Sequence, residues 1–145
     1  MRLTQHTDFS IRVLIFLGVH PDRRCTIQEI AHGYDISRNH LMKVVQKLAA
    51  AGYVASVRGS GGGLTLPRDP KDINLGDVVR RMEPDFGMVE CMREGNDCVI
   101  TPACKLPPVL AEATRAYLDV ISRYTLADLL ATEDANRMRL LLRSG

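Results

Sequence analysis

The sequence of 145 residues lacks tryptophan, has few aromatic side chains and contains no long apolar run. No segment approaches the roughly 18 consecutive apolar residues of a membrane-spanning helix. The N-terminal residues, MRLTQHTDFSIR, also lack the basic stretch, apolar core and cleavage site of a secretory signal. We therefore expect a cytoplasmic protein, and its hydrophobic content of 46% is sufficient for a buried core.

The sequence also lacks motifs that are typical of enzymes. No glycine-rich nucleotide-binding motif follows a predicted strand, and no histidine occurs after His40. These absences argue against an enzyme that uses thiol or electron-transfer chemistry. The net charge is only +2, but residues 1–66 carry eight Arg and Lys against four Asp and Glu. A basic N-terminal half favours a polyanionic partner.

The N-terminal residues predict two helices. Apolar positions at helical spacing indicate a first helix over residues 8–19, with Thr7 or Asp8 as its N-cap. Thr26 and Glu29 form a capping box for a short second helix.

A third helix follows after a tight connection, with Ser37 as its cap and Gly52 as its C-terminal stop. Its apolar stripe consists of Leu41, Val44, Val45 and Leu48. Two helices joined in this way indicate a helix-turn-helix. The opposite face carries side chains able to contact bases or phosphates in a major groove, namely Arg38, Asn39, His40, Lys43 and Lys47.

A β-hairpin is predicted directly after the third helix. Residues 53–57 and 64–66 are β-prone, and the segment between them is rich in glycine. A hairpin at this position indicates a wing, with Arg58 and Ser60 able to approach the DNA backbone. The predicted fold is therefore mainly α with a small β wing, and residues 1–66 form the winged helix-turn-helix.

Residues 74–131 are predicted to form a second unit. Asn74 caps a helix that Pro84 ends, residues 87–106 form an irregular cysteine segment, and a long helix follows to about Tyr124. The long helix has more apolar surface than a small domain can cover, which indicates a dimerisation helix. Thr125 caps a short helix, and residues 132–145 are expected as a C-terminal tail of uncertain structure.

Three of the four cysteines, Cys91, Cys98 and Cys104, lie close together, with six and five residues between them. A cytoplasmic setting disfavours disulfides, so the triplet favours a metal or redox site. Zinc sites usually have about two to four residues between paired ligands, and neither gap fits. Three thiolates on a loop can instead hold an iron-sulfur cluster. A zinc site of unusual spacing in a structural protein, and free buried thiols, are the alternatives.

A four-iron cluster needs a further ligand from outside this segment. The candidates are His6, Asp8 and Cys25, all in the predicted DNA-binding half. Cys25 has a second interpretation as a buried structural thiol. Ligation from this half would couple the cluster physically to the geometry of DNA binding.

Six segments carry a resemblance to a known family: MRLTQHTDFSIRVL, ISRNHLMKVVQKL followed by AGYV, VRGSGGGLTL, NLGDVVRRMEP, ITPACKL and YTLADL. Together they resemble the Rrf2 family of bacterial regulators, and most closely its nitric-oxide-sensing repressors. The resemblance extends from Met1 to about Leu130. It implies a homodimeric winged helix-turn-helix repressor that binds a palindromic operator in double-stranded DNA.

The resemblance also implies a ligand set. In such proteins a 4Fe-4S cluster is held by three cysteines, here Cys91, Cys98 and Cys104, and by an Asp of the opposite subunit, which matches Asp8. A 2Fe-2S cluster is the alternative. Family members that regulate iron-sulfur assembly use a His three residues after the last Cys, where this chain has Pro107. The implied function is control of nitrosative-stress genes, with an iron or redox sensor of the same fold as the alternative.

Overall fold

The computed structural model describes residues 2–143, which form seven α-helices, two short 3-10 helices and one two-stranded sheet. The α-helices are α1 (Gln5–Gly18), α2 (Ile27–Tyr34), α3 (Arg38–Ala50), α4 (Leu75–Met82), α5 (Leu106–Ile121), α6 (Leu126–Leu129) and α7 (Thr132–Arg143). The strands are β1 (Ala55–Val57) and β2 (Gly63–Thr65), and the 3-10 helices are η1 (Pro70–Asp72) and η2 (Glu90–Met92). The mainly helical fold with a small sheet agrees with the fold predicted from the sequence.

Helix α1 begins earlier than its apolar pattern predicted. Its N-cap is Thr4, whose hydroxyl oxygen accepts a hydrogen bond from the amide of Thr7 at 3.3 Å. The prediction of Thr7 or Asp8 as the cap was therefore wrong, because polar residues before the apolar stripe still form a helical turn. Asp8 instead lies in the first turn of α1, where its negative charge interacts favourably with the positive end of the helix dipole.

The core of the protein is formed mainly by α1, α2 and α3, with further buried residues from α4, α6 and the hairpin. Leu14 of α1, Ile30 of α2 and Leu48 of α3 are all fully buried in it. The predicted capping box of α2 is present, since Glu29 accepts a hydrogen bond from the amide of Thr26 and donates its own amide to the Thr26 hydroxyl. Ser37 occupies the N-cap position of α3, but its side chain makes no capping hydrogen bond, which corrects that prediction.

The hairpin after α3 is antiparallel and pairs Ala55 with Thr65 and Val57 with Gly63. It is tied to the body because the backbones of Cys25 and Leu64 exchange two hydrogen bonds, of 3.0 and 2.7 Å. The turn is tight at Gly62, where a Cβ atom would collide with the carbonyl oxygen of Val57. The wing predicted from the glycine-rich segment is therefore present.

Helix α4 connects the winged helix to α5. Asn74 caps it as predicted, because its Oδ1 accepts from the amide of Asp77 at 3.1 Å. The Asn74 side chain also donates to the carbonyl of Ser122 at 2.7 Å, just after α5. A Cβ atom at Gly76 would collide with the Ser122 hydroxyl, so the two segments pack in close contact.

The sequence left residues 132–145 without a predicted structure. Residues 132–143 form α7, while Ser144 and Gly145 lie outside the described residues. Leu142 packs against the core, and the Arg139 guanidinium donates a hydrogen bond to the carbonyl of Val19 at the end of α1. Together α1–α4, α6, α7 and the hairpin form one packed unit, which we call the body.

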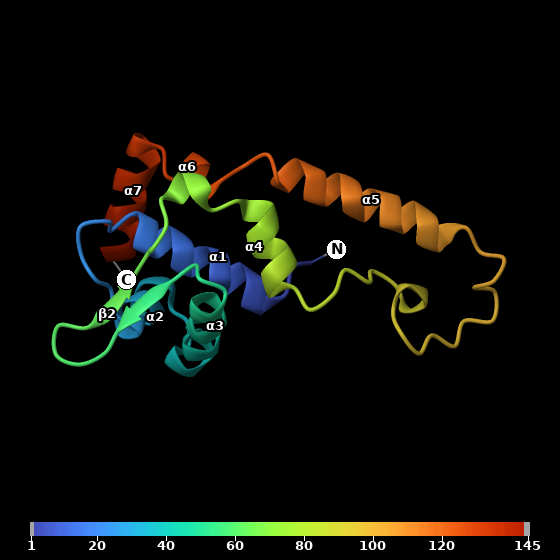
Figure 1. The fold of residues 1–145 in the computed structure, drawn as a ribbon, viewed down its shortest axis with the longest axis horizontal. Coiled ribbons are helices and arrows are strands. Elements are labelled where there is room, and N and C mark those ends of the chain that lie inside the picture. Colours follow the sequence, from blue (N-terminus) through green and yellow to red (C-terminus); the bar gives the residue numbers. More distant parts are fainter. Residues whose placement is uncertain (1, 144–145) are drawn as a thin grey trace.

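Helix α5 and the cysteine segment before it project away from the body (Figure 1). Of the 16 residues of α5, only Thr114 is buried. Large apolar side chains stay exposed along it, at Leu106, Val109 and Val120. Among residues 2–143, no helix is both long and apolar enough to cross a membrane.

Candidate DNA interface and cysteine segment

Helix α3 presents the polar face that the sequence predicted. Arg38, Asn39 and Lys43 are exposed, whereas Leu41 and Val44 on the other side are fully buried. This division follows from the 3.6-residue period, because apolar contacts with α1 and α2 orient the remaining side chains outward. Arg38, Asn39 and Lys43 are therefore accessible for groove or phosphate contacts.

His40 is less accessible than its three neighbours. Its ring packs edge-on against the ring of Phe9 in α1, with the centroids 4.8 Å apart. Phe9 also lies beneath the guanidinium of Arg12, at 5.6 Å from its centroid. His40 thus links the predicted recognition helix to the N-terminal part of α1.

Lys47 has a partner within the chain. Its ammonium donates a hydrogen bond of 2.9 Å to the carbonyl oxygen of Met82, the last residue of α4. Carbonyls at the C-terminus of a helix lack an intrahelical donor and attract cations. Sequence position alone grouped Lys47 with the DNA-contacting side chains and could not reveal this contact.

The wing exposes Arg58 and Ser60, as expected. It is supported by a residue that sequence reasoning missed. Arg24, in the loop before α2, donates a hydrogen bond of 2.9 Å to the carbonyl of Gly61 at the wing tip. The only signal in the sequence for this role of Arg24 is its place in a pair of basic residues just before the predicted helix-turn-helix.

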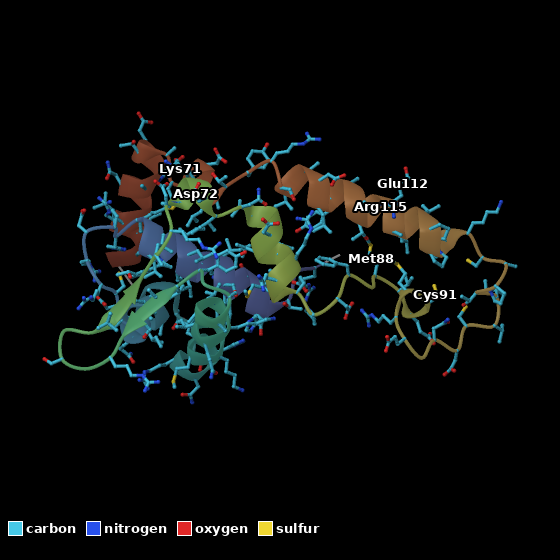
Figure 2. The ribbon with its side chains drawn as sticks, in the orientation of Figure 1. Lys71, Asp72, Met88, Cys91, Glu112 and Arg115 are labelled. Carbon is cyan, nitrogen blue, oxygen red and sulfur yellow. The ribbon has the colours of Figure 1, made fainter. Side chains whose placement is uncertain are left out.

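The cysteine segment is irregular, as predicted, apart from η2. Cys91 lies in η2, and Figure 2 shows Met88 and Cys91 on this segment, away from the helices of the body. Cys98 is exposed, and its amide donates to the side chain of Asn96 at 2.9 Å. The Sγ atom of Cys104 accepts a hydrogen bond from the amide of Leu106 at 3.4 Å. All three cysteines are free thiols.

Asp8 does not meet the cysteines within one chain. No group of three or more His, Cys, Asp and Glu side chains is close enough to hold a metal ion in residues 2–143. Asp8 pairs instead with Arg12 one turn later, with contacts of 2.8 and 3.2 Å, and its side chain remains 45% exposed. A carboxylate this accessible can exchange partners.

The other two candidates for the fourth ligand differ from Asp8. Cys25 is fully buried in the core, and this burial raises the pKa of its thiol. Its position agrees with a structural thiol. The Nε2 atom of His6 is buried without a hydrogen-bond partner, and burial together with the charges of Lys47 and His40 lowers the pKa of its imidazole.

The chemistry of the donor set fits an iron-sulfur cluster. Three free thiols of intermediate or full exposure lie on one loop, and thiolates are the usual cluster ligands. An amide N–H already points at Cys104 Sγ, and such hydrogen bonds tune the potential of bound clusters. The loop must close for its thiols to share a cluster, because the three are not gathered in residues 2–143.

Comparison with known proteins places these features in a regulator. Residues 3–132 match the Rrf2 family, described as "Iron-dependent Transcriptional regulator". The chain is 52% identical to the "HTH-type transcriptional regulator NsrR" of Bacillus subtilis (strain 168), over 92% of this chain and 93% of that protein. A protein of the same description from Geobacillus kaustophilus is 43% identical, over 99% and 97% of the two chains.

A solved structure supports the same fold. The structure titled "T. potens IscR" superposes with a TM-score of 0.69 at 27% identity, covering 90% of this chain and 86% of that one. The similar proteins regulate transcription and are not enzymes, and regulators of this kind bind DNA. From its sequence match, its winged helix and its similarity to NsrR, the chain belongs to the Rrf2 family of transcriptional regulators.

Proposed function

We propose that this regulator is a cytoplasmic repressor that senses nitric oxide through an iron-sulfur cluster and controls genes that detoxify nitric oxide. The observation that carries the proposal is the group of three free thiols, Cys91, Cys98 and Cys104, on one irregular loop. The loop belongs to a chain that is 52% identical to a regulator named NsrR.

The working form is a homodimer. Helix α5 buries only Thr114 and exposes Leu106, Val109 and Val120, which recur at spacings close to whole helical turns. An exposed apolar stripe of this kind is stabilised when a second copy covers it. Two copies related by a two-fold axis present two α3 helices, and such an arrangement matches a palindromic operator with half-sites one helical turn apart.

Operator contacts come from two elements of each subunit. Arg38, Asn39 and Lys43 of α3 reach base edges and phosphates in the major groove, while Arg58 and Ser60 of the wing approach the backbone. His40 adds a contact only as far as its packing on Phe9 allows.

The cluster is a 4Fe-4S cluster ligated by Cys91, Cys98 and Cys104 of one subunit and Asp8 of the partner subunit. When bound, it would supply iron that can react with nitric oxide in place of protein ligands. Asp8 has an alternative partner one turn away, since it pairs with Arg12 at 2.8 Å. Release of Asp8 therefore changes the contacts of α1, which packs directly on the recognition helix through Phe9 and His40.

The test is anaerobic purification, assay of iron and sulfide per chain, and titration with nitric oxide during operator binding. We expect four irons per chain and loss of operator binding as nitric oxide is added. A stable cluster that is indifferent to nitric oxide would contradict the proposed effector. Zinc without iron or sulfide would contradict the cluster itself.

Two cysteine variants provide matched controls. Cys98→Ser removes a ligand on the exposed loop and should abolish cluster binding, whereas Cys25→Ala changes a buried thiol and should keep the cluster. Equal cluster content in both variants would remove Cys98 from the ligand set.

An iron sensor of the same fold is the second candidate, because the family is described as iron-dependent. Such a sensor would lose its cluster under iron limitation. Nitric oxide would not change its binding to the operator.

A further inference from the structure

The end of helix α4 is a junction between three functional segments. Met82 is the last residue of α4 and is almost completely buried, at 1% exposure, and Glu83 is its C-cap. One contact comes from α3, one from the start of α1, and the chain itself continues into the cysteine segment. We call this pair of residues the Met82–Glu83 junction.

The contact from α3 is made by Lys47. Its ammonium donates to the carbonyl of Met82 at 2.9 Å, so one end of the predicted recognition helix is held on the C-terminus of α4. A charged donor on an unpaired helix-terminal carbonyl makes a strong and directional bond. Lys43, one turn earlier on α3, is exposed like Lys47 but makes no such hydrogen bond among residues 2–143.

The contact from α1 is made by Thr4. One carboxylate oxygen of Glu83 accepts hydrogen bonds from the Thr4 amide at 2.7 Å and from the Thr4 hydroxyl at 3.1 Å. Thr4 is also the N-cap of α1 and lies one helical turn before Asp8. Movement of the α1 N-terminus therefore acts directly on Glu83.

The cysteine segment leaves from the same junction. Cys91 follows Glu83 by eight positions, with Pro84 between them. Both proposed sources of cluster ligands, Asp8 and the cysteine loop, thus connect to Glu83, the residue next to the Met82 carbonyl that holds Lys47.

We propose that the Met82–Glu83 junction transmits the state of the cluster to the recognition helix, and that Lys47 is a positioning residue on this route rather than a phosphate contact. The inference rests on the cluster-sensing function proposed above. In each subunit, ligation pulls on the cysteine loop at its own cluster and on Asp8 at the cluster of the other subunit. The junction shifts, and the Lys47 contact carries the shift to α3.

The experiment compares Lys47→Met with Lys43→Met in the full-length protein. Operator affinity is measured for the cluster-loaded and cluster-free forms, each over a series of salt concentrations. The ratio of the two affinities reports transmission, and the slope of affinity against salt reports phosphate contacts. Lys43→Met should lower the slope by about one and keep the ratio.

Lys47→Met should do the opposite. We expect an unchanged salt slope. The ratio of operator affinities between the cluster-loaded and cluster-free forms should move about tenfold closer to one, because a tenfold change corresponds to the loss of one charge-assisted hydrogen bond. Lys47→Arg, which keeps a donor for the Met82 carbonyl, should restore the ratio. A Lys47→Met variant with a reduced slope and the wild-type ratio overturns the inference.

Glu83→Ala provides a second route to the same answer if Lys47→Met does not fold. It removes the acceptor of both Thr4 hydrogen bonds without changing α3. It should therefore also bring the ratio of the two operator affinities closer to one. A wild-type ratio in Glu83→Ala overturns the inference. Wild-type protein whose two forms bind the operator equally instead contradicts the cluster-sensing function, so the two failures are distinguishable.

Discussion

The body differs sharply from α5 and the cysteine segment before it, which together we call the arm, in how it is stabilised. In the body, α1 alone buries six residues, among them Val13 and Leu14, whereas the longer α5 buries only Thr114. The cysteine segment before α5 buries none of its residues between positions 87 and 106. The body therefore resembles an independently folded domain, and the arm resembles one part of a larger assembly.

This contrast separates two tasks of one chain. A rigid body can present α3 and the wing to DNA in a defined geometry, because its side chains are closely packed. A segment with few internal contacts opens and closes at low cost, which suits a ligand-sensing loop. Four predictions test the contrast.

The largest effect is expected from a charge in the apolar stripe of α5. Val109→Glu should convert the proposed dimer into monomers, because an unpaired carboxylate would be buried where a second copy is proposed to pack. Sedimentation measures the mass, and circular dichroism should show a folded body. Arg115→Glu, on the opposite side of α5, is the control and should remain dimeric. A dimeric Val109→Glu variant would place the interface elsewhere.

The next effect is expected in the core of the body. Leu14→Ala should lower the free energy of unfolding by about 2 to 5 kcal/mol, because Leu14 is fully buried and its loss leaves a cavity. Arg115→Ala, on the side of α5 away from the proposed interface, should change it by less than about 1 kcal/mol. Urea unfolding of both variants measures the difference, and similar losses would remove the distinction between body and arm.

A moderate effect is expected at the DNA interface. Asn39→Ala should weaken operator binding by about 1 to 3 kcal/mol, because an exposed amide on α3 can pair with adenine. Cluster content should stay unchanged, since Asn39 is not one of the proposed cluster ligands. A gel-shift titration with an iron assay tests both points, and wild-type affinity would remove Asn39 from the interface.

The smallest effect is expected at the capping box of α2. Thr26→Ala should cost about 1 kcal/mol of stability.

Burial acts to raise the pKa of Glu29, but hydrogen bonds from Thr26 and the charge of Arg23 outweigh it, so the pKa is lowered. The stability from Glu29 is thus present above the ordinary Glu pKa and is lost as pH falls through the lowered value. Unfolding measured against pH should show this loss in wild type but not in Glu29→Gln.

Local sequence patterns predicted much of the body correctly. The capping box at Thr26, the Asn74 cap and the glycine-rich wing each depend on residues that are neighbours in sequence, so their chemistry is visible without a fold. The cap of α1 was misplaced at Thr7 or Asp8, because the helix begins before its apolar stripe does. Helix α7 was missed, because Leu142 packs against a core formed by residues far away in sequence.

The sequence by itself determined the helix-turn-helix, the wing and the presence of three cysteines on one loop, because spacing and side-chain chemistry are local properties. Only the tertiary structure decided which side chains are available. It engages Lys47 with the Met82 carbonyl, pairs Asp8 with Arg12, holds the wing with Arg24 and leaves one side of α5 exposed. Contacts between residues distant in the chain depend on how the elements pack, and no local pattern encodes that geometry.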